Sequence, residues 1–134
     1  MANNITLKEV IKHVETFHTA FGIKNKYEPT AEISESEGKL RFDLMREENE
    51  EYLAAVKDGD LIEIADALGD MLYILSGTML KHGMQDKIQA VFEEIQRSNM
   101  SKLDADGKAI YREDGKVLKS DLYFKPDIAS ILNS

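Results

Sequence analysis

The sequence contains no cysteine and no tryptophan, and only two prolines occur among its 134 residues. Without thiols the chain forms neither a disulfide nor a thiolate metal site. It has no run of about 18 apolar residues and no signal-peptide pattern, so we expect a cytoplasmic protein that crosses no membrane. Apolar residues nevertheless make up 43% of the chain, which predicts the core of one domain over residues 1–134.

Basic residues are also scarce, and the formal net charge is -8. Residues 1–96 carry 19 acids and 10 bases, whereas residues 97–125 carry 7 bases and 5 acids. A chain this acidic repels nucleic acid through its general field, so we expect no nucleic-acid partner. A polyanion would bind the acidic part only if cations lay between the two.

Apolar residues recur at helical spacing through most of the chain. The predicted helices cover about residues 6–21, 37–57, 61–82 and 85–97. Thr6 and Glu9 form a capping box, and Gly59 followed by Asp60 ends one helix and caps the next. Two Asp-Gly pairs around "KAIYRE" predict a hairpin or ordered loop, and "KPDIASIL" predicts a short last helix. The fold class is therefore all-α, an antiparallel four-helix bundle-like core with a C-terminal hairpin or ordered loop.

The stretch "EENEE" places four glutamates within residues 47–51. Each helical residue turns about 100°, so Glu48 and Glu51 fall on the same face as Leu44 and extend a line of apolar and small residues. Glu50 points elsewhere and has the position of an ordinary solvated charge. Two of the glutamates are therefore expected at the edge of the core.

The next predicted helix repeats this arrangement with Glu63, Asp66 and Asp70, and no base occurs between Lys57 and Lys81 to neutralise them. A tight turn between the two helices would bring their acidic faces together. Carboxylates in a partly buried space are unfavourable unless they take up protons or bind hard cations. Oxygen ligands favour Mg²⁺ or Mn²⁺. We therefore expect a metal site formed by Glu48, Glu51, Glu63 and Asp66.

The motif E-E-x-x-E at residues 47–51, followed by E-x-x-D at residues 63–66, resembles the all-α nucleoside triphosphate pyrophosphohydrolases. These include MazG-like enzymes, dimeric dUTPases and phosphoribosyl-ATP pyrophosphohydrolases. "FHTAFG", "DALGDMLYIL" and "RSNMSKLDADGKAIYREDGKVLK" further resemble a bacterial and phage branch of phosphoribosyl-ATP-pyrophosphohydrolase-like proteins. The resemblance implies Mg²⁺-dependent conversion of a (d)NTP and water into a (d)NMP and pyrophosphate, a housekeeping activity for which dUTP is the first substrate to test.

The resemblance also assigns residue roles. It carries the metal ligands onto Glu48, Glu51, Glu63 and Asp66. The expected catalytic residues are Glu47, which would orient the attacking water or accept its proton, and the metal-binding Glu48. The expected phosphate-holding residues are Arg97, Asn99 and Lys102. His18 either packs in the core or helps line a nucleotide pocket, and Asp70 receives no role.

Three alternatives stay open. The first is phosphoribosyl-ATP hydrolysis in histidine biosynthesis, and the second is a non-enzymatic helical module whose acidic groove binds a basic partner. The third is a di-iron protein, because Glu15 and His18 form one E-x-x-H motif of the kind that di-iron bundles carry twice. A P-loop cradle is excluded because no G-x-x-x-x-G-K-[ST] stretch occurs. The helix predicted at residues 61–82 is apolar almost all round, so we expect a homodimer or a dimer of dimers.

Overall fold

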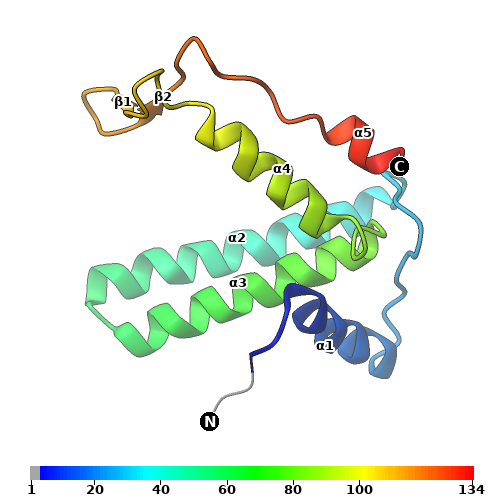
Figure 1. Ribbon diagram of the computed structural model, residues 1–134. Helices are drawn as coiled ribbons and strands as arrows, with labels where there is room; N and C mark the ends of the chain where they lie inside the picture. Colours follow the sequence, from blue (N-terminus) through cyan, green and yellow to red (C-terminus); the bar gives the residue numbers. More distant parts are fainter. Residues whose placement is uncertain (1–3) are drawn as a thin grey trace. The chain divides into compact units, whose positions relative to one another are not determined.

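The computed structural model describes residues 4–134, and these residues are mostly α-helical (Figure 1). The helices are α1 (Leu7–Ala20), α2 (Glu35–Asp58), α3 (Leu61–Lys81), α4 (Ile88–Met100) and α5 (Ile128–Leu132). Two short strands, β1 (Ile110–Tyr111) and β2 (Val117–Leu118), pair as an antiparallel hairpin. The predicted all-α class and the predicted hairpin are both confirmed. Within the described residues, each helix is too short or too polar to cross a membrane.

The chain divides into two compact units, and Asp86 is the last residue of the first. In the first unit, α1 and α2 both pack against α3. The second unit contains α4, the β-hairpin and α5. Three helices thus form the packed part of the first unit, and the fourth predicted helix belongs to the second. A single domain over residues 1–134 stays a prediction.

Helix boundaries follow the cap residues of the sequence. The Thr6 hydroxyl accepts a hydrogen bond from the Glu9 backbone N–H, and the Glu9 side chain accepts one from the Thr6 backbone, so the predicted capping box forms. Gly59 ends α2 in the left-handed conformation with φ +65°, and the Asp60 side chain accepts from the Glu63 N–H at the start of α3. Only two residues therefore separate α2 from α3, and the two helices run antiparallel side by side (Figure 1).

Helix α4 begins and ends three residues later than the sequence pattern predicts. At its start, residues 85–87 form turns, and the side-chain amide of Gln85 donates to the backbone oxygen of Lys26. At its end, neither glycine nor proline follows Arg97 to terminate the helix, so it continues to Met100.

Polar contacts link α2 to α3, and α1 to the loop that follows it, at the end of the hairpin remote from Gly59. His18 on α1 is 3% exposed, and its Nδ1 lies 2.6 Å from Asn25 Oδ1. Arg41 on α2 reaches α3, where its Nε donates to Thr78 Oγ1 at 3.0 Å. Its Nη2 donates to the Ile74 backbone oxygen at 2.9 Å. These hydrogen bonds hold both side chains in place.

Gly77 on α3 provides the space that these two side chains occupy. A Cβ atom at this position would lie 2.6 Å from Arg41 Nη2 and 2.9 Å from His18 Nε2. Neither neighbour can withdraw without breaking a hydrogen bond. The packing of the three helices therefore requires a glycine here.

Gly77→Ala should lower the free energy of unfolding by about 1–2 kcal/mol, because overpacking outweighs the gain in helix propensity. Gly69 lies on the same helix, and nothing lies within 4 Å of its Cβ position. Gly69→Ala is thus the matched control and should raise the free energy of unfolding by about 0.5–1 kcal/mol. Denaturant unfolding measures both changes, and an equal effect of the two substitutions would contradict this role of Gly77.

Candidate functional site

Three glutamates of the E-E-x-x-E motif lie on α2. Glu48 is half-buried, whereas Glu47 and Glu51 are exposed. The Oε2 atom of Glu48 is buried and has no hydrogen-bond partner among the described residues. A buried polar atom without a partner costs about 1–3 kcal/mol, so this oxygen is a place where a proton or a cation is favoured.

The electrostatics of Glu48 identify its acidic neighbours. Burial is the largest of the causes that raise its pKa to about 7, and the next is a side-chain hydrogen bond that the protonated carboxyl makes with Glu51. The negative charges of Asp70 and Asp66 on α3 raise the same pKa further. Side chains of two helices thus act on one carboxyl group. We call these four residues the carboxylate cluster: Glu48, Glu51, Asp66 and Asp70.

Asp70 is the member that sequence reasoning left without a role. Glu48 lies 11 residues before Gly59 and Asp70 lies 11 residues after it, so an antiparallel hairpin places them at the same level. Counting outward from the turn would have found this pair. Glu63 is exposed in the first turn of α3 and is not among the charges that shift the pKa of Glu48. Its role as a metal ligand stays a prediction.

The chemistry of the carboxylate cluster suits a hard cation, because every donor is an oxygen and Glu48 Oε2 has no partner among the described residues. Within residues 4–134, no three His, Asp or Glu side chains lie in an arrangement that would hold one metal ion. Glu51, Asp66 and Asp70 are all exposed, so their side chains have room to adopt other rotamers. Uptake of an ion therefore requires side-chain rotation at the cluster.

The three expected phosphate-holding residues belong to the second unit. Arg97 donates from Nε to Glu94 Oε1 at 2.7 Å and from Nη2 to Glu94 Oε2 at 3.0 Å. Its guanidinium carbon also lies 4.4 Å from the centre of the Phe124 ring. This bidentate pair occupies donors that a phosphate would otherwise use. Asn99 is exposed and Lys102 is half-buried, and substrate binding by all three stays a prediction.

His18 lies in the interior of the first unit. Burial lowers the pKa of its imidazole, and the positive charges of Arg41 and Lys81 lower it further, whereas the hydrogen bond that the ring donates to Asn25 Oδ1 raises it. A neutral, hydrogen-bonded ring in this position fits the core-packing alternative. A contact between His18 and a nucleotide stays a prediction.

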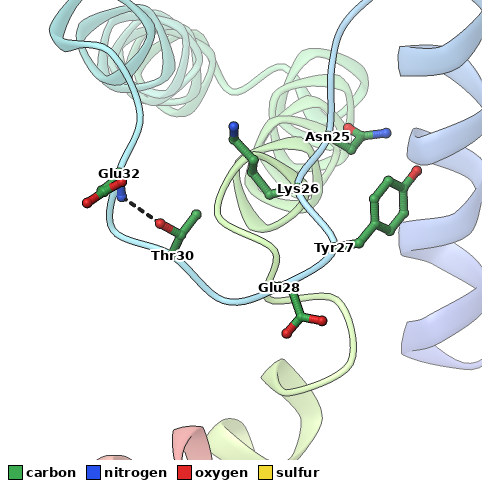
Figure 2. A pocket seen from close by; sticks show the side chains of 6 residues that line it. All are labelled: Asn25, Lys26, Tyr27, Glu28, Thr30 and Glu32. Carbon is green, nitrogen blue, oxygen red and sulfur yellow. Dashed lines mark hydrogen bonds between the residues drawn. The ribbon is translucent and has the colours of Figure 1, made fainter.

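A pocket of about 380 Å³ lies on the loop between α1 and α2 (Figure 2). It is lined by Asn25, Lys26, Tyr27, Glu28, Thr30 and Glu32. Two of its lining side chains already make hydrogen bonds with nearby residues. The Thr30 hydroxyl accepts from the Glu32 N–H at 3.0 Å, and the Tyr27 hydroxyl donates to Glu15 on α1 at 2.8 Å. The pocket shares no residue with the carboxylate cluster.

Comparison with known proteins identifies related sequences. A family model described as phosphoribosyl-ATP pyrophosphohydrolase matches residues 14–99, which include the whole carboxylate cluster. An uncharacterized protein of Acanthamoeba polyphaga mimivirus is 38% identical over 64 residues, which is 48% of this chain and 26% of that protein. The chain therefore spans about a quarter of the length of the curated relative that it matches.

The raised pKa of Glu48 predicts a pH dependence of stability in the metal-free protein. A carboxyl group whose pKa is higher in the folded state stabilises the fold at low pH, and this contribution is lost as the pH rises from about 4.5 to about 7. Glu48→Gln carries a neutral amide at every pH. It should therefore unfold at a higher temperature than the wild type above pH 7, with the difference vanishing near pH 4.5.

Thermal unfolding in the presence of a chelator, measured from pH 4.5 to pH 8, tests this expectation. The matched control is Glu50→Gln on the same helix, because Glu50 is exposed and its carboxylate lies 3.8 Å from Arg46. The control should keep the wild-type pH slope. Parallel pH profiles for the wild type and Glu48→Gln would rule out the raised pKa.

Proposed function

The chain belongs to the phosphoribosyl-ATP pyrophosphohydrolase family, within the MazG-like all-α superfamily, and from this premise we propose that it is a Mg²⁺-dependent nucleotide pyrophosphohydrolase. The proposed reaction converts a nucleoside triphosphate and water into a nucleoside monophosphate and pyrophosphate. The observation that carries the proposal is the buried Oε2 atom of Glu48, which has no hydrogen-bond partner among residues 4–134 and belongs to a cluster of carboxylates.

Charge explains why the activity would need divalent ions. A triphosphate brings about four negative charges to a site that already holds four carboxylates, and such groups repel each other strongly at short range. Bound Mg²⁺ would neutralise phosphate oxygens and lower the pKa of a water molecule. The carboxylate cluster supplies the oxygen ligands. Glu47, which is exposed next to Glu48, would orient the attacking water and accept its proton.

We include Asp70 among the proposed metal ligands, in addition to Glu48, Glu51, Glu63 and Asp66. The support is its effect on the pKa of Glu48, which requires the two carboxylates to be neighbours. Glu63 lies one turn of helix closer to Gly59 than Asp66, so it would contribute at the edge of the site.

The substrate separates two versions of the proposal. The description of the matching family favours phosphoribosyl-ATP. A free nucleotide such as dUTP is the other candidate, and it would give the protein a housekeeping role in the nucleotide pool. Both substrates carry the triphosphate that the carboxylate cluster would act on, so the cluster itself does not choose between them.

The first unit exposes many large apolar side chains. Ile62 is 79% exposed, Leu61 75% and Phe42 62%. The buried apolar residues of this unit are few, namely Ile11, Val14, Ala55, Ala67 and Leu80. Exposed apolar surface of this kind is typical of interfaces. We therefore propose that the protein is a homodimer or a dimer of dimers.

Purified protein with Mg²⁺ should release pyrophosphate from at least one member of a panel containing dUTP, dCTP and phosphoribosyl-ATP. Glu48→Gln and Asp70→Asn should each lower the rate by at least about tenfold, because each would remove a charged oxygen ligand of the metal. Glu63→Gln should lower it less.

Calorimetric titration with Mg²⁺ separates a catalytic loss from a metal-binding loss in these variants, and Glu50→Gln again serves as the control. A wild type that takes up no divalent ion and hydrolyses no triphosphate would refute the enzyme, and would favour the acidic binding module.

Sedimentation velocity at micromolar concentration should give a mass of two or four chains. Leu61→Glu and Ile62→Glu place a charge on exposed apolar positions, so they should shift the distribution toward the single chain without loss of helix. A wild type that sediments as a single chain of 15.2 kDa would contradict the oligomer.

A further inference from the structure

A second pocket of the first unit carries a net positive charge, whereas the carboxylate cluster is negative. Its volume is about 460 Å³, and its wall includes Lys24, Glu37, Arg41 and Lys81. Volumes of about 300–1,000 Å³ are typical of sites for small molecules. None of its lining residues belongs to the carboxylate cluster. We call it the cationic pocket.

Lys81 is a buried cation in the wall of this pocket. It is 7% exposed, and its Nζ donates to the backbone oxygen of Lys24 at 2.8 Å. The nearest carboxylate oxygen, Glu37 Oε1, lies at 3.8 Å, which is too far for a hydrogen bond. An ammonium group has three N–H donors, so Lys81 keeps donating capacity toward the pocket.

Arg41 is a second cation in the wall of this pocket, and the described residues give it no ion pair. Within residues 4–134, no carboxylate oxygen lies within 4.0 Å of its guanidinium nitrogens. Hydrogen bonds to Thr78 and Ile74 occupy two of its five N–H groups. Burial lowers the pKa of this guanidinium, which means that removal from water makes its charged form less favourable. An anion in the pocket would offset this effect.

The charge balance of the pocket indicates the kind of anion. Lys24, Arg41 and Lys81 are positive and Glu37 is negative, which leaves two positive charges in a protein whose net charge is -8. The adjacent His18 does not add a third, because burial and these same cations lower its pKa. A phosphate monoester near neutral pH carries about two negative charges and matches this balance.

We propose that the cationic pocket binds the phosphate group of a small phosphomonoester, and that it does so without a divalent metal. Arg41 supplies the planar pair of donors that phosphate oxygens accept, and Lys81 supplies a point charge beside it. The site goes beyond the proposed hydrolysis. Arg41 lies seven residues before Glu48 on α2, which is about 10 Å along the helix axis.

Calorimetry with the full chain, in a chelator and without phosphate buffer, tests the proposal with glycerol 3-phosphate as the probe. The wild type should bind it saturably at one site per chain. Arg41→Gln and Lys81→Gln should each weaken binding at least tenfold. Glu37→Gln removes the competing carboxylate while keeping all three cations, so it should tighten binding several-fold.

Arg46→Gln is the matched control. It removes the same charge from the same helix, but Arg46 is exposed and lies within 4.0 Å of Asp43 and Glu50. It should bind the probe like the wild type. Circular dichroism verifies that each variant folds. Should Arg41→Gln fail to fold, Glu37→Gln carries the test alone, because its tightening requires a folded pocket.

Each of the following outcomes would overturn the proposal: no saturable binding to the wild type, equal weakening by Arg41→Gln and Arg46→Gln, or a Glu37→Gln variant that binds no more tightly. Glycerate, which carries a carboxylate in place of the phosphate, should bind at least tenfold more weakly, and equal binding would reject the phosphate assignment. Glu48→Gln should bind the probe normally. If the wild type binds the probe but hydrolyses no triphosphate of the panel, the proposed enzyme is refuted and the cationic pocket remains supported.

Discussion

Repulsion between the carboxylates of α2 and α3 is the constraint on which the first unit depends. The two-residue connection through Gly59 and Asp60 brings these helices side by side. Their acidic faces then meet at Glu48, whose pKa is raised to about 7 by burial first, and in addition by Glu51, Asp70 and Asp66. The fold carries this cost until a proton or a cation relieves it. In the proposed site, a bound divalent ion would offset this repulsion.

Cations gather at the other end of the same two helices. Arg41 and Lys81 lie away from the turn and line one pocket with the loop after α1, and Gly77 leaves room for Arg41. The carboxylate cluster and the cationic pocket therefore use different turns of the same two helices. Had Arg41 paired with Glu48, each would have neutralised the other, and neither the proposed metal site nor the proposed anion site would be possible.

The second unit uses its positive charge differently. Glu94 accepts both donors of Arg97, and it also accepts the Asp127 backbone N–H at 2.6 Å. The guanidinium therefore helps to hold the start of α5 against α4. At least one of the bases after residue 96 therefore stabilises the fold. The sequence pattern alone did not distinguish this role from phosphate binding.

The sequence by itself determined the helices, the caps at Thr6 and Asp60, and the presence of two acidic helix faces, because periodicity and capping depend on neighbours within a few residues. Tertiary structure decided which residues meet. It placed Asp70 rather than Glu63 beside Glu48, and it buried His18. It also joined Arg41 to a residue 37 positions away. A helical period fixes the direction of a side chain about its own axis, but the level at which two helices meet is set by their turn and their packing.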